Sequence, residues 1–303
     1  MSAAYATDSA MQTHFSHPSV SLQVKATSTT PPATRFLELD GGHIAYDDVG
    51  SGPLVIMVPG LGDVRAEYRT LAPRLAAAGY RAVTMDLRGH GESSTGWPDH
   101  SASAIGADVL ALVKRLDAGP ATLIGTSMGA AAVAWAAAEA PQAVSGIVAI
   151  GPFVRDVPPK SRLSGWAQKA IIKLAFAGPW GAWAWKKFYA TLYGTKPSDF
   201  DAYATALAAN LAEPGRMDAL RAMMAASKAD VEARLHEVRA PSLTIMGTAD
   251  PDFADPRAEA DTVAGLLRGS AMMVDGAGHY PQVEQPDAVA AAIVSFIRAN
   301  GRS

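Results

Sequence analysis

The sequence has 303 residues, of which 49% are hydrophobic and 18% are charged, and its formal net charge is −3. A chain of this length can bury one large core, and a charge this close to zero gives no reason to expect a nucleic-acid partner. Because the sequence contains no cysteine, disulfides, cysteine nucleophiles and thiolate metal sites are excluded. These totals are typical of one soluble globular domain.

The first 33 residues differ in composition from the rest of the chain. Residues 1–33 are rich in Ser, Thr, Ala and Pro and carry almost no charge, and they contain no apolar core of a secretory signal. We expect a disordered leader, with an overlong start before Met11 or a cleavable targeting peptide as alternatives. No apolar stretch is long enough to span a membrane, so the sequence predicts a cytoplasmic protein.

From residue 34 onward, segments with strand composition alternate with segments of helical periodicity. Two short apolar segments flank the glycine-rich turn at 40–42, which predicts a hairpin. The later strands are separated by helices, a pattern that predicts an α/β fold with a mainly parallel sheet and helices on both faces. The eight predicted strands are 36–39, 43–46, 53–58, 81–85, 121–124, 146–150, 242–246 and 270–274, the last read as a buried strand. Helical periodicity is found at 68–75, 105–116, 130–136 and 289–297.

The interval between the sixth and seventh predicted strands is much longer than one connecting helix requires. Residues 153–237 are helical in pattern, and prolines and glycines divide them into about four helices. We therefore expect a helical cap inserted into a core formed by 34–152 and 238–303. Aromatic side chains gather in the first half of this cap, where they either pack the cap against the core or line an apolar substrate pocket. The predicted pocket residues are Trp166, Trp180, Trp183 and Tyr189.

The first half of the cap is also basic, although the protein is net acidic. Between residues 151 and 197 there are eight Lys and Arg residues and a single acidic one, Asp156. Such a surface is usually a solvated helix face, but lysine combined with tryptophan also occurs where proteins rest on anionic membranes. A weak membrane-surface contact through the cap is therefore the alternative to a solvated face.

A serine stands at the centre of a glycine-flanked turn between a predicted strand and a predicted helix. The pentapeptide GTSMG at 125–129 places Ser127 two residues from Gly125 and two from Gly129. A strand-to-helix turn this sharp strains the central residue and leaves no room for neighbouring Cβ atoms. It would hold the hydroxyl at the positive end of the helix dipole, as a nucleophile requires, whereas a helix-capping serine is the alternative interpretation.

A histidine and an aspartate each follow a later strand. His279 lies in the loop DGAGHYP at 275–281, and Asp250 ends the segment GTAD at 247–250. The carboxyl ends of parallel strands meet at one edge of an open sheet, so we expect both side chains near Ser127. A serine hydroxyl needs an imidazole to accept its proton, and the imidazole needs a carboxylate to fix its tautomer. All three are candidate catalytic residues, with Asp252 as the alternative acid.

A glycine-rich turn, PGLGD at 59–63, follows the third predicted strand. Such a turn leaves backbone N–H groups free to bind an oxygen atom of a ligand. The N–H groups of Leu61 and Met128 are the predicted donors of an oxyanion hole. A dinucleotide-binding turn is excluded, because Arg65 occupies the position of the third glycine.

Five motifs, in this order, resemble those of the α/β-hydrolase superfamily, in particular serine esterases and lipases with a helical cap. They are PGLG at 59–62, DLRGHGES at 86–93, GTSMG at 125–129, GTAD at 247–250 and GHYP at 278–281. The resemblance implies that Ser127 is the nucleophile, His279 the general base and Asp250 the acid that orients it. Many members carry His-Gly where this chain has Pro59-Gly60, so we expect the loop to be anchored differently.

The function expected from these residues is that of a serine hydrolase that needs no cofactor and no metal. Its substrate would be a small carboxylic ester or related acyl compound, cleaved through an acyl-enzyme. The same residues can perform carbon–carbon bond hydrolysis, perhydrolysis or acyl transfer, and a hydrolase-like protein that only binds a small molecule is a further interpretation. Epoxide or haloalkane chemistry is disfavoured, since those relatives use aspartate where Ser127 stands.

Overall fold

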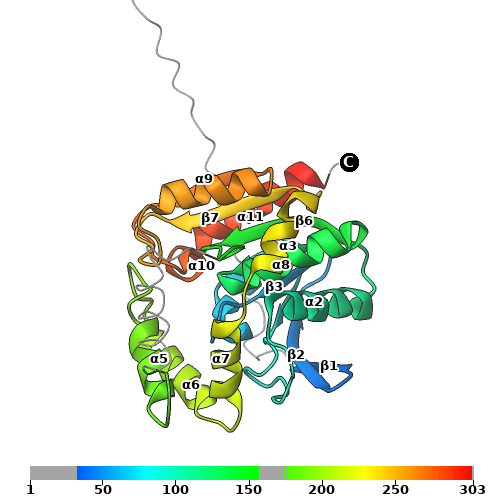
Figure 1. Ribbon diagram of the computed structural model, residues 1–303. Helices are drawn as coiled ribbons and strands as arrows, with labels where there is room; N and C mark the ends of the chain where they lie inside the picture. Colours follow the sequence, from blue (N-terminus) through cyan, green and yellow to red (C-terminus); the bar gives the residue numbers. More distant parts are fainter. Residues whose placement is uncertain (1–32, 157–173, 175, 302–303) are drawn as a thin grey trace, which may run out of the picture.

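A central twisted sheet with helices on both faces forms the body of the computed structural model, which describes residues 33–156, 174 and 176–301 (Figure 1). The described chain contains one sheet in the order β1-β2-β4-β3-β5-β6-β7-β8. The pairs β1–β2 and β2–β4 are antiparallel, and all other pairs are parallel. The predicted eight-stranded, mostly parallel α/β fold is therefore confirmed. The strands are β1 (Arg35–Leu39), β2 (Gly42–Val49), β3 (Leu54–Val58), β4 (Arg81–Met85), β5 (Ala121–Thr126), β6 (Val144–Ile150), β7 (Ser242–Gly247) and β8 (Ser270–Val274).

The helices of the core cover both faces of this sheet. Side chains alternate along β3, so that Leu54 packs with α2 and α3 on one face, while Val55 packs with α1 and α11 on the other. Every residue of β3 is buried, as expected for a strand covered on both sides. The core helices are α1 (Leu71–Ala77), α2 (Ala102–Leu116), α3 (Met128–Glu139), α9 (Pro256–Leu266), α10 (Pro281–Glu284) and α11 (Pro286–Asn300). Short 3-10 turns are η1 (Arg65–Arg69), η2 (Pro141–Ala143) and η3 (Leu235–Glu237).

The sequence predicts that the last strand is buried, but most of it is only partly buried. In β8, Ser270 is exposed, residues 271–273 are partly buried and only Val274 is buried. The reason is its place in the sheet, because β8 pairs with β7 on one side and is the terminal strand of the sheet on the other. The apolar composition of the segment could not reveal that edge position.

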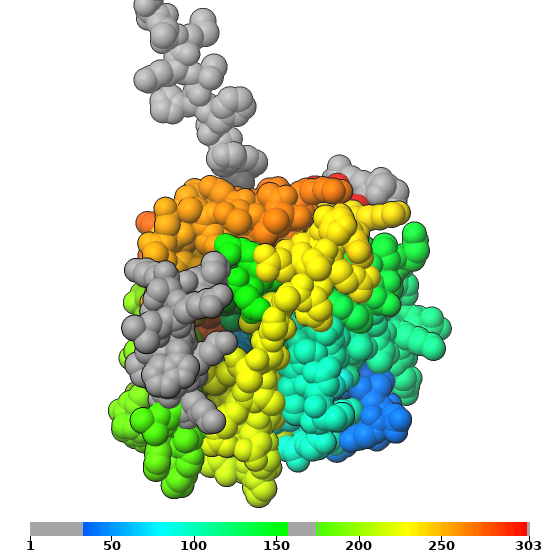
Figure 2. Space-filling view, in the orientation of Figure 1, coloured from blue at the N-terminus to red at the C-terminus, as the bar shows by residue number. Residues whose placement is uncertain are grey.

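The cap helices lie beside the carboxyl ends of the parallel strands (Figure 1). Within the described residues they are α5 (Gly181–Tyr189), α6 (Phe200–Leu211) and α7 (Arg216–Ala225), and they share an apolar cluster to which Tyr280 and Val283 of the core also belong. The following helix, α8 (Ala229–Arg234), lies instead against α3 and α2, and Val231 belongs to the core cluster. In Figure 2 this segment is the yellow band that runs from the cap onto the core.

Some sequence-based expectations fall on residues that the structure does not describe. These are nearly all of the predicted leader at 1–33, the pocket residue Trp166, and several of the lysines and arginines of the basic half of the cap. In the part of the chain that is described, no helix is both long enough and apolar enough to cross a bilayer.

Candidate functional site

Ser127 occupies the turn between β5 and α3 and has a strained backbone. Its φ of 53° and ψ of −116° are unusual for a residue with a side chain. The flanking glycines make the turn sterically feasible, since a Cβ on Gly125 would collide with Gly129, and a Cβ on Gly129 would collide with the carbonyl oxygen of Val58. The N–H of Ser127 donates to the carbonyl of Ile150 at 2.8 Å. The turn is thereby fixed to the neighbouring strand β6.

His279 lies in the loop after β8, and contacts on several sides hold its ring in place. The backbone N–H of His279 donates to the carbonyl of Leu192 at 2.7 Å, and the backbone N–H of Gly278 donates to Glu284 Oε1 at 2.8 Å. A Cβ on Gly151 would come within 3.0 Å of the imidazole. The imidazole Nδ1 is 2.8 Å from Asp250 Oδ2, and both side chains are buried.

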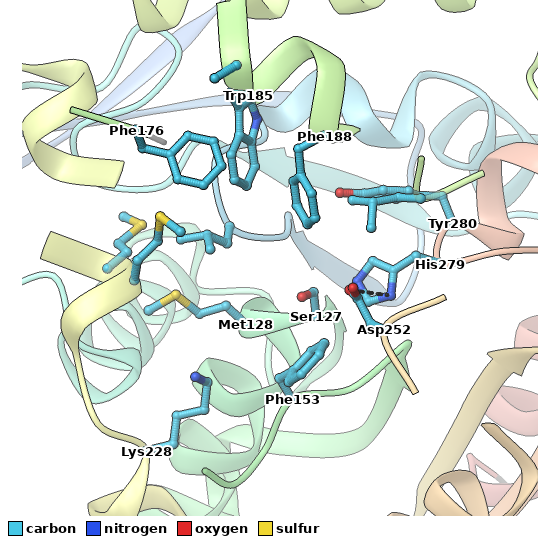
Figure 3. Close-up of a pocket in the computed structure, with 15 residues that line it drawn as sticks. Ser127, Met128, Phe153, Phe176, Trp185, Phe188, Lys228, Asp252, His279 and Tyr280 are labelled. Atoms are coloured by element: carbon cyan, nitrogen blue, oxygen red, sulfur yellow. Dashed lines mark ion pairs between the residues drawn. The ribbon is translucent and has the colours of Figure 1, made fainter. Parts of the chain in front are cut away.

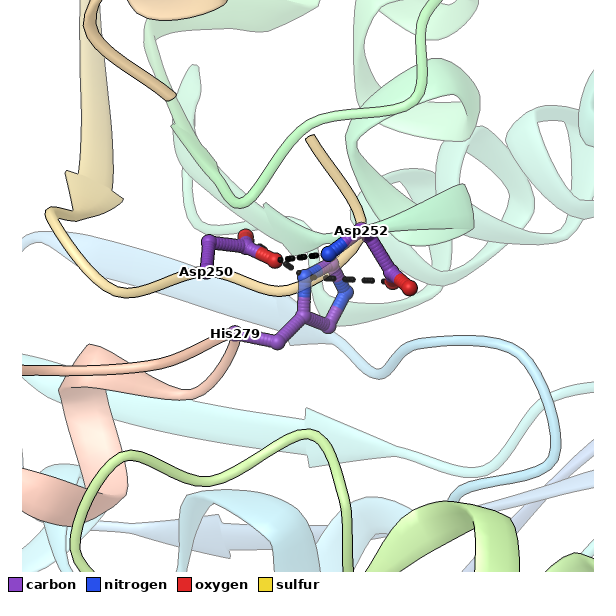
Figure 4. Close-up of side chains that lie close together, drawn as sticks. All are labelled: Asp250, Asp252 and His279. Carbon is purple, nitrogen blue, oxygen red and sulfur yellow. Dashed lines mark hydrogen bonds and ion pairs between the residues drawn. The ribbon is translucent and has the colours of Figure 1, made fainter. Parts of the chain in front are cut away.

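The two carboxylates near His279 have different relations to its ring (Figure 4). Asp252 Oδ2 is 3.6 Å from Nδ1, farther than Asp250, and the N–H of Asp252 donates to Asp250 Oδ1 at 3.0 Å. Burial acts to lower the pKa of His279, but the charge and hydrogen bond of Asp250, with a contribution from Asp252, raise it above its usual value. Burial raises the pKa of Asp252, against the charge of His279.

In the described chain, one cluster of side chains has the ligand types and spacing that could hold a metal ion, and it consists of these three residues. Ligand atoms of Asp250, Asp252 and His279 lie within 4.8 Å of one another. However, His279 Nδ1 and both oxygens of Asp250 already take part in hydrogen bonds within this group. This is the bonding expected of a carboxylate that orients an imidazole.

Ser127 and His279 face a common cavity of about 520 Å³ (Figure 3). Leu61 and Met128 also line it, so both residues predicted to supply oxyanion-hole N–H groups border the same space. Met128 is the first residue of α3, where an N–H has no acceptor within the helix. The rest of the wall is largely apolar and aromatic and comes from both core and cap. It includes Phe153, Phe176, Trp185, Phe188, Met223, Met224 and Tyr280.

The loop that carries Leu61 is anchored by a buried carboxylate. The N–H of Gly60 donates to Glu67 Oε2 at 2.8 Å, and Gln282 Nε2 donates to Glu67 Oε1 at 2.7 Å. Gln282 also donates to Thr126 Oγ1, next to Ser127. Sequence reasoning missed Glu67 and Gln282. The one signal in the sequence was that Glu67 immediately precedes the segment 68–75, which has helical periodicity.

A second buried carboxylate connects this loop to the cap. Asp63 accepts hydrogen bonds from the hydroxyl of Tyr189, in α5, at 2.8 Å and from the hydroxyl of Tyr203, in α6. Burial raises the pKa of Asp63 to about 6, although both tyrosines oppose the shift. Burial and the nearby charge of Asp63 raise the pKa of Glu67 to about 8. At neutral pH Glu67 is therefore mostly protonated behind the cavity, whereas Asp63 is mostly ionised.

The three predicted pocket residues that the structure describes, Trp180, Trp183 and Tyr189, do not line the cavity. Trp180 and Trp183 are 50% and 63% exposed, and Tyr189 is fully buried behind the wall, where it bonds to Asp63. The reason is the phase of α5, because residues four apart on a helix share a face. Trp185 and Tyr189 lie on the buried face, so Trp183 projects to the outside.

Comparisons with known proteins agree with this architecture. A sequence model of the α/β hydrolase fold matches residues 53–286. A Mycobacterium tuberculosis protein named as a non-heme bromoperoxidase, BpoC, is 38% identical over 109 residues, which are 35% of this chain and 40% of that protein. The chain thus spans less than half the length of that relative.

Two further likenesses extend over most of the chain. The Pseudomonas putida protein 2-hydroxy-6-oxononadienedioate/2-hydroxy-6-oxononatrienedioate hydrolase 1 is 26% identical over 282 residues, covering 89% of this chain and 98% of that protein. The solved structure of the esterase EaEST from Exiguobacterium antarcticum has a TM-score of 0.75 at 18% identity, covering 89% of this chain and 100% of that one. At this identity the esterase supports the fold alone. With the family match spanning most of its length, the chain belongs to the α/β-hydrolase family.

Proposed function

We propose that this protein is a serine hydrolase that cleaves a small carboxylic ester or related acyl compound. The observation that supports the proposal most is the 2.8 Å contact between His279 Nδ1 and Asp250 Oδ2. His279 of this pair lines the same cavity as Ser127, Leu61 and Met128. The candidate nucleophile, the candidate base and the two residues that carry the candidate oxyanion donors therefore surround one space, and the candidate acid contacts the base.

The proposed reaction begins when Ser127 Oγ attacks the carbonyl carbon and passes its proton to His279 Nε2. Asp250 holds the proton on Nδ1 and stabilises the imidazolium that forms. The N–H groups of Leu61 and Met128 stabilise the tetrahedral oxyanion, and His279 then protonates the leaving group. In the second half, His279 removes a proton from water as it attacks the acyl-enzyme, and then returns a proton to Ser127 Oγ as the acid is released.

Asp250 is the proposed acid in preference to Asp252. Its carboxylate is closer to His279 Nδ1, at 2.8 Å against 3.6 Å, and it is buried. The N–H of Asp252 donates to Asp250, so the role we assign to Asp252 is to orient the acid through its backbone.

Labelling with a fluorophosphonate probe tests the proposal directly. We expect the wild-type protein to be labelled and Ser127→Ala to be unlabelled. His279→Ala should lose about 10³-fold or more in kcat on 4-nitrophenyl esters of varied acyl length. A folded wild-type protein that neither reacts with the probe nor hydrolyses any ester would overturn the proposal and favour a small-molecule binding role.

Carbon–carbon bond hydrolysis is the second candidate. The relative that supports it is named as a hydrolase of 2-hydroxy-6-oxononadienedioate, and it aligns over 89% of the chain. The same Ser127 and His279 would serve either reaction. Turnover of 2-hydroxy-6-oxononadienedioate, measured beside the esters, separates the two activities. A higher kcat/KM on the dienedioate than on every ester would favour this second function.

A further inference from the structure

A single cationic side chain stands in the otherwise apolar wall of the cavity. Among the described residues that line it, Lys228 is the one lysine or arginine. In Figure 3 its amino group points into the cavity, and Lys228 and Asp252 lie on opposite sides of Ser127. The positive charge of Lys228 is therefore separate from the Asp252–His279 cluster.

The ammonium group of Lys228 lacks a hydrogen-bonding or ion-pairing partner in the described part of the chain. The nearby carboxylate of Asp156 accepts hydrogen bonds from the N–H of Lys228, at 3.1 and 3.2 Å, and from the hydroxyl of Ser227 at 2.5 Å. Burial lowers the pKa of Lys228, while the charge of Asp156 opposes that shift. A partly buried cation without a direct partner is costly, and an anionic ligand would offset the cost.

The backbone around Lys228 holds it where cap and core meet. Lys228 is the residue immediately before α8, a helix that packs against α3 of the core. On its other side is α7, which contributes Met223 and Met224 to the cavity wall. Because the backbone N–H is bound by Asp156, the side chain starts from a fixed point beside the cavity.

We propose that Lys228 is a specificity-determining residue that binds a carboxylate group of the substrate. The reactive carbonyl would lie at Ser127, and the part of the substrate between the two groups would be apolar, in contact with Met128 and Phe153. The substrate class is then an ester or acyl compound that carries a remote carboxylate. This inference rests on the proposed function for the position of the carbonyl, but the anion site itself can be tested without turnover.

Binding to the Ser127→Ala protein tests the anion site independently of chemistry. The probes are ω-phenylalkanoates with two to six methylene groups, each compared by calorimetry with the alcohol of the same length. At least one carboxylate should bind about tenfold or more tightly than its alcohol, since hydrogen bonds to charged groups are the strong ones. Lys228→Met should abolish that advantage, Lys228→Arg should keep most of it, and Lys114→Met, a change on the exposed face of α2, should leave it intact.

Equal affinity of every carboxylate and its alcohol would overturn the proposal, and so would an advantage that survives Lys228→Met. Turnover is compared in proteins that retain Ser127. The ratio of kcat/KM for 4-nitrophenyl hemiglutarate to kcat/KM for 4-nitrophenyl pentanoate should be about tenfold lower in Lys228→Met than in the wild-type protein. If neither ester is hydrolysed while the carboxylate preference in binding holds, the esterase proposal fails and the anion site stands.

Discussion

Glu67 Oε2 accepts a hydrogen bond from the N–H of Gly60 at 2.8 Å. This bond holds the peptide between Pro59 and Gly60, which is next to the peptide that carries the Leu61 N–H, a proposed oxyanion donor. The sequence raised the question of how this loop is held, because Pro59 replaces the histidine of many relatives. In this chain a carboxylate from η1, itself bonded to Gln282, provides the anchor.

Removing the Glu67 side chain should therefore impair both activity and stability. In Glu67→Ala the N–H of Gly60 loses a buried acceptor, which typically costs about 1–3 kcal/mol in the free energy of unfolding. A misplaced Leu61 N–H should lower kcat on a 4-nitrophenyl ester, by up to about 10²-fold if one oxyanion donor is largely lost. Glu67→Gln keeps an oxygen for Gly60 and should retain most of kcat.

Urea unfolding and steady-state kinetics of both variants check this prediction. Glu38→Ala, on the exposed side of β1, is the matched surface control and should change neither quantity. A Glu67→Ala protein with wild-type kcat would show that the Leu61 peptide does not depend on this anchor.

The raised pKa of Glu67 predicts how stability depends on pH. Its pKa is about 8 in the folded protein against an ordinary value of 4.5, so the folded state binds more protons between these values. The contribution of Glu67 to the free energy of unfolding should therefore be fully present below pH 4.5. It should decrease as the pH rises toward 8, by at most about 1.4 kcal/mol per pH unit. Gln282 Oε1 has no partner among the described residues, so a rotated amide could accept the proton of Glu67.

Urea unfolding of wild type and Glu67→Gln between pH 5 and pH 9 measures this effect. Glutamine does not titrate, so the free-energy difference between the two proteins should move in favour of Glu67→Gln as the pH rises. A difference that stays constant across the range would mean that Glu67 titrates near its ordinary value in the folded state. Asp63, whose pKa is about 6, contributes a similar decline at lower pH that both proteins share.

The local parts of this architecture could be predicted from the sequence, because each rests on residues close together in the chain. The strand-to-helix turn at Ser127 follows from two glycines whose absent Cβ atoms make it possible. Asp250 and His279 each follow a predicted strand, and parallel strand ends converge on one edge. The order of strands and turns therefore places the backbone of these residues at the sheet edge, but it does not determine the direction of their side chains.

Features that depend on distant partners could not be predicted in the same way. Glu67 matters because Gly60 and Gln282 bond to it, and Gln282 lies 215 residues away in the sequence. The aromatic wall depends on where α5 begins, since a shift of two residues would turn Trp183 toward the buried face and Trp185 toward the outside. The exposure of β8 depends on strand order, which local composition does not encode.

The link between loop and cap through Asp63 can be tested at Tyr203. The hydroxyl of Tyr203 donates to Asp63, and its loss in Tyr203→Phe leaves a buried carboxyl group with one donor fewer. We expect a loss of about 1–3 kcal/mol in the free energy of unfolding. Tyr80→Phe is the matched control, because Tyr80 is buried and its hydroxyl forms no hydrogen bond within the described residues. Urea unfolding that gave equal losses for both variants would assign the effect to packing.

The pH dependence of turnover tests the roles proposed for the two aspartates. Only neutral His279 can accept the proton of Ser127, so kcat/KM should fall as the pH drops through the pKa of His279, which lies above 6.5. Asp250→Asn removes the nearest negative charge and should move that acidic limb to lower pH, while kcat falls by up to about 10⁴-fold because the tautomer is no longer fixed. Asp252→Asn removes a charge 3.6 Å from Nδ1 and keeps the backbone N–H, so it should shift the limb less and spare most of kcat. Profiles of kcat/KM on a 4-nitrophenyl ester from pH 5 to pH 9 measure both effects. A larger loss in Asp252→Asn than in Asp250→Asn would transfer the orienting role to Asp252.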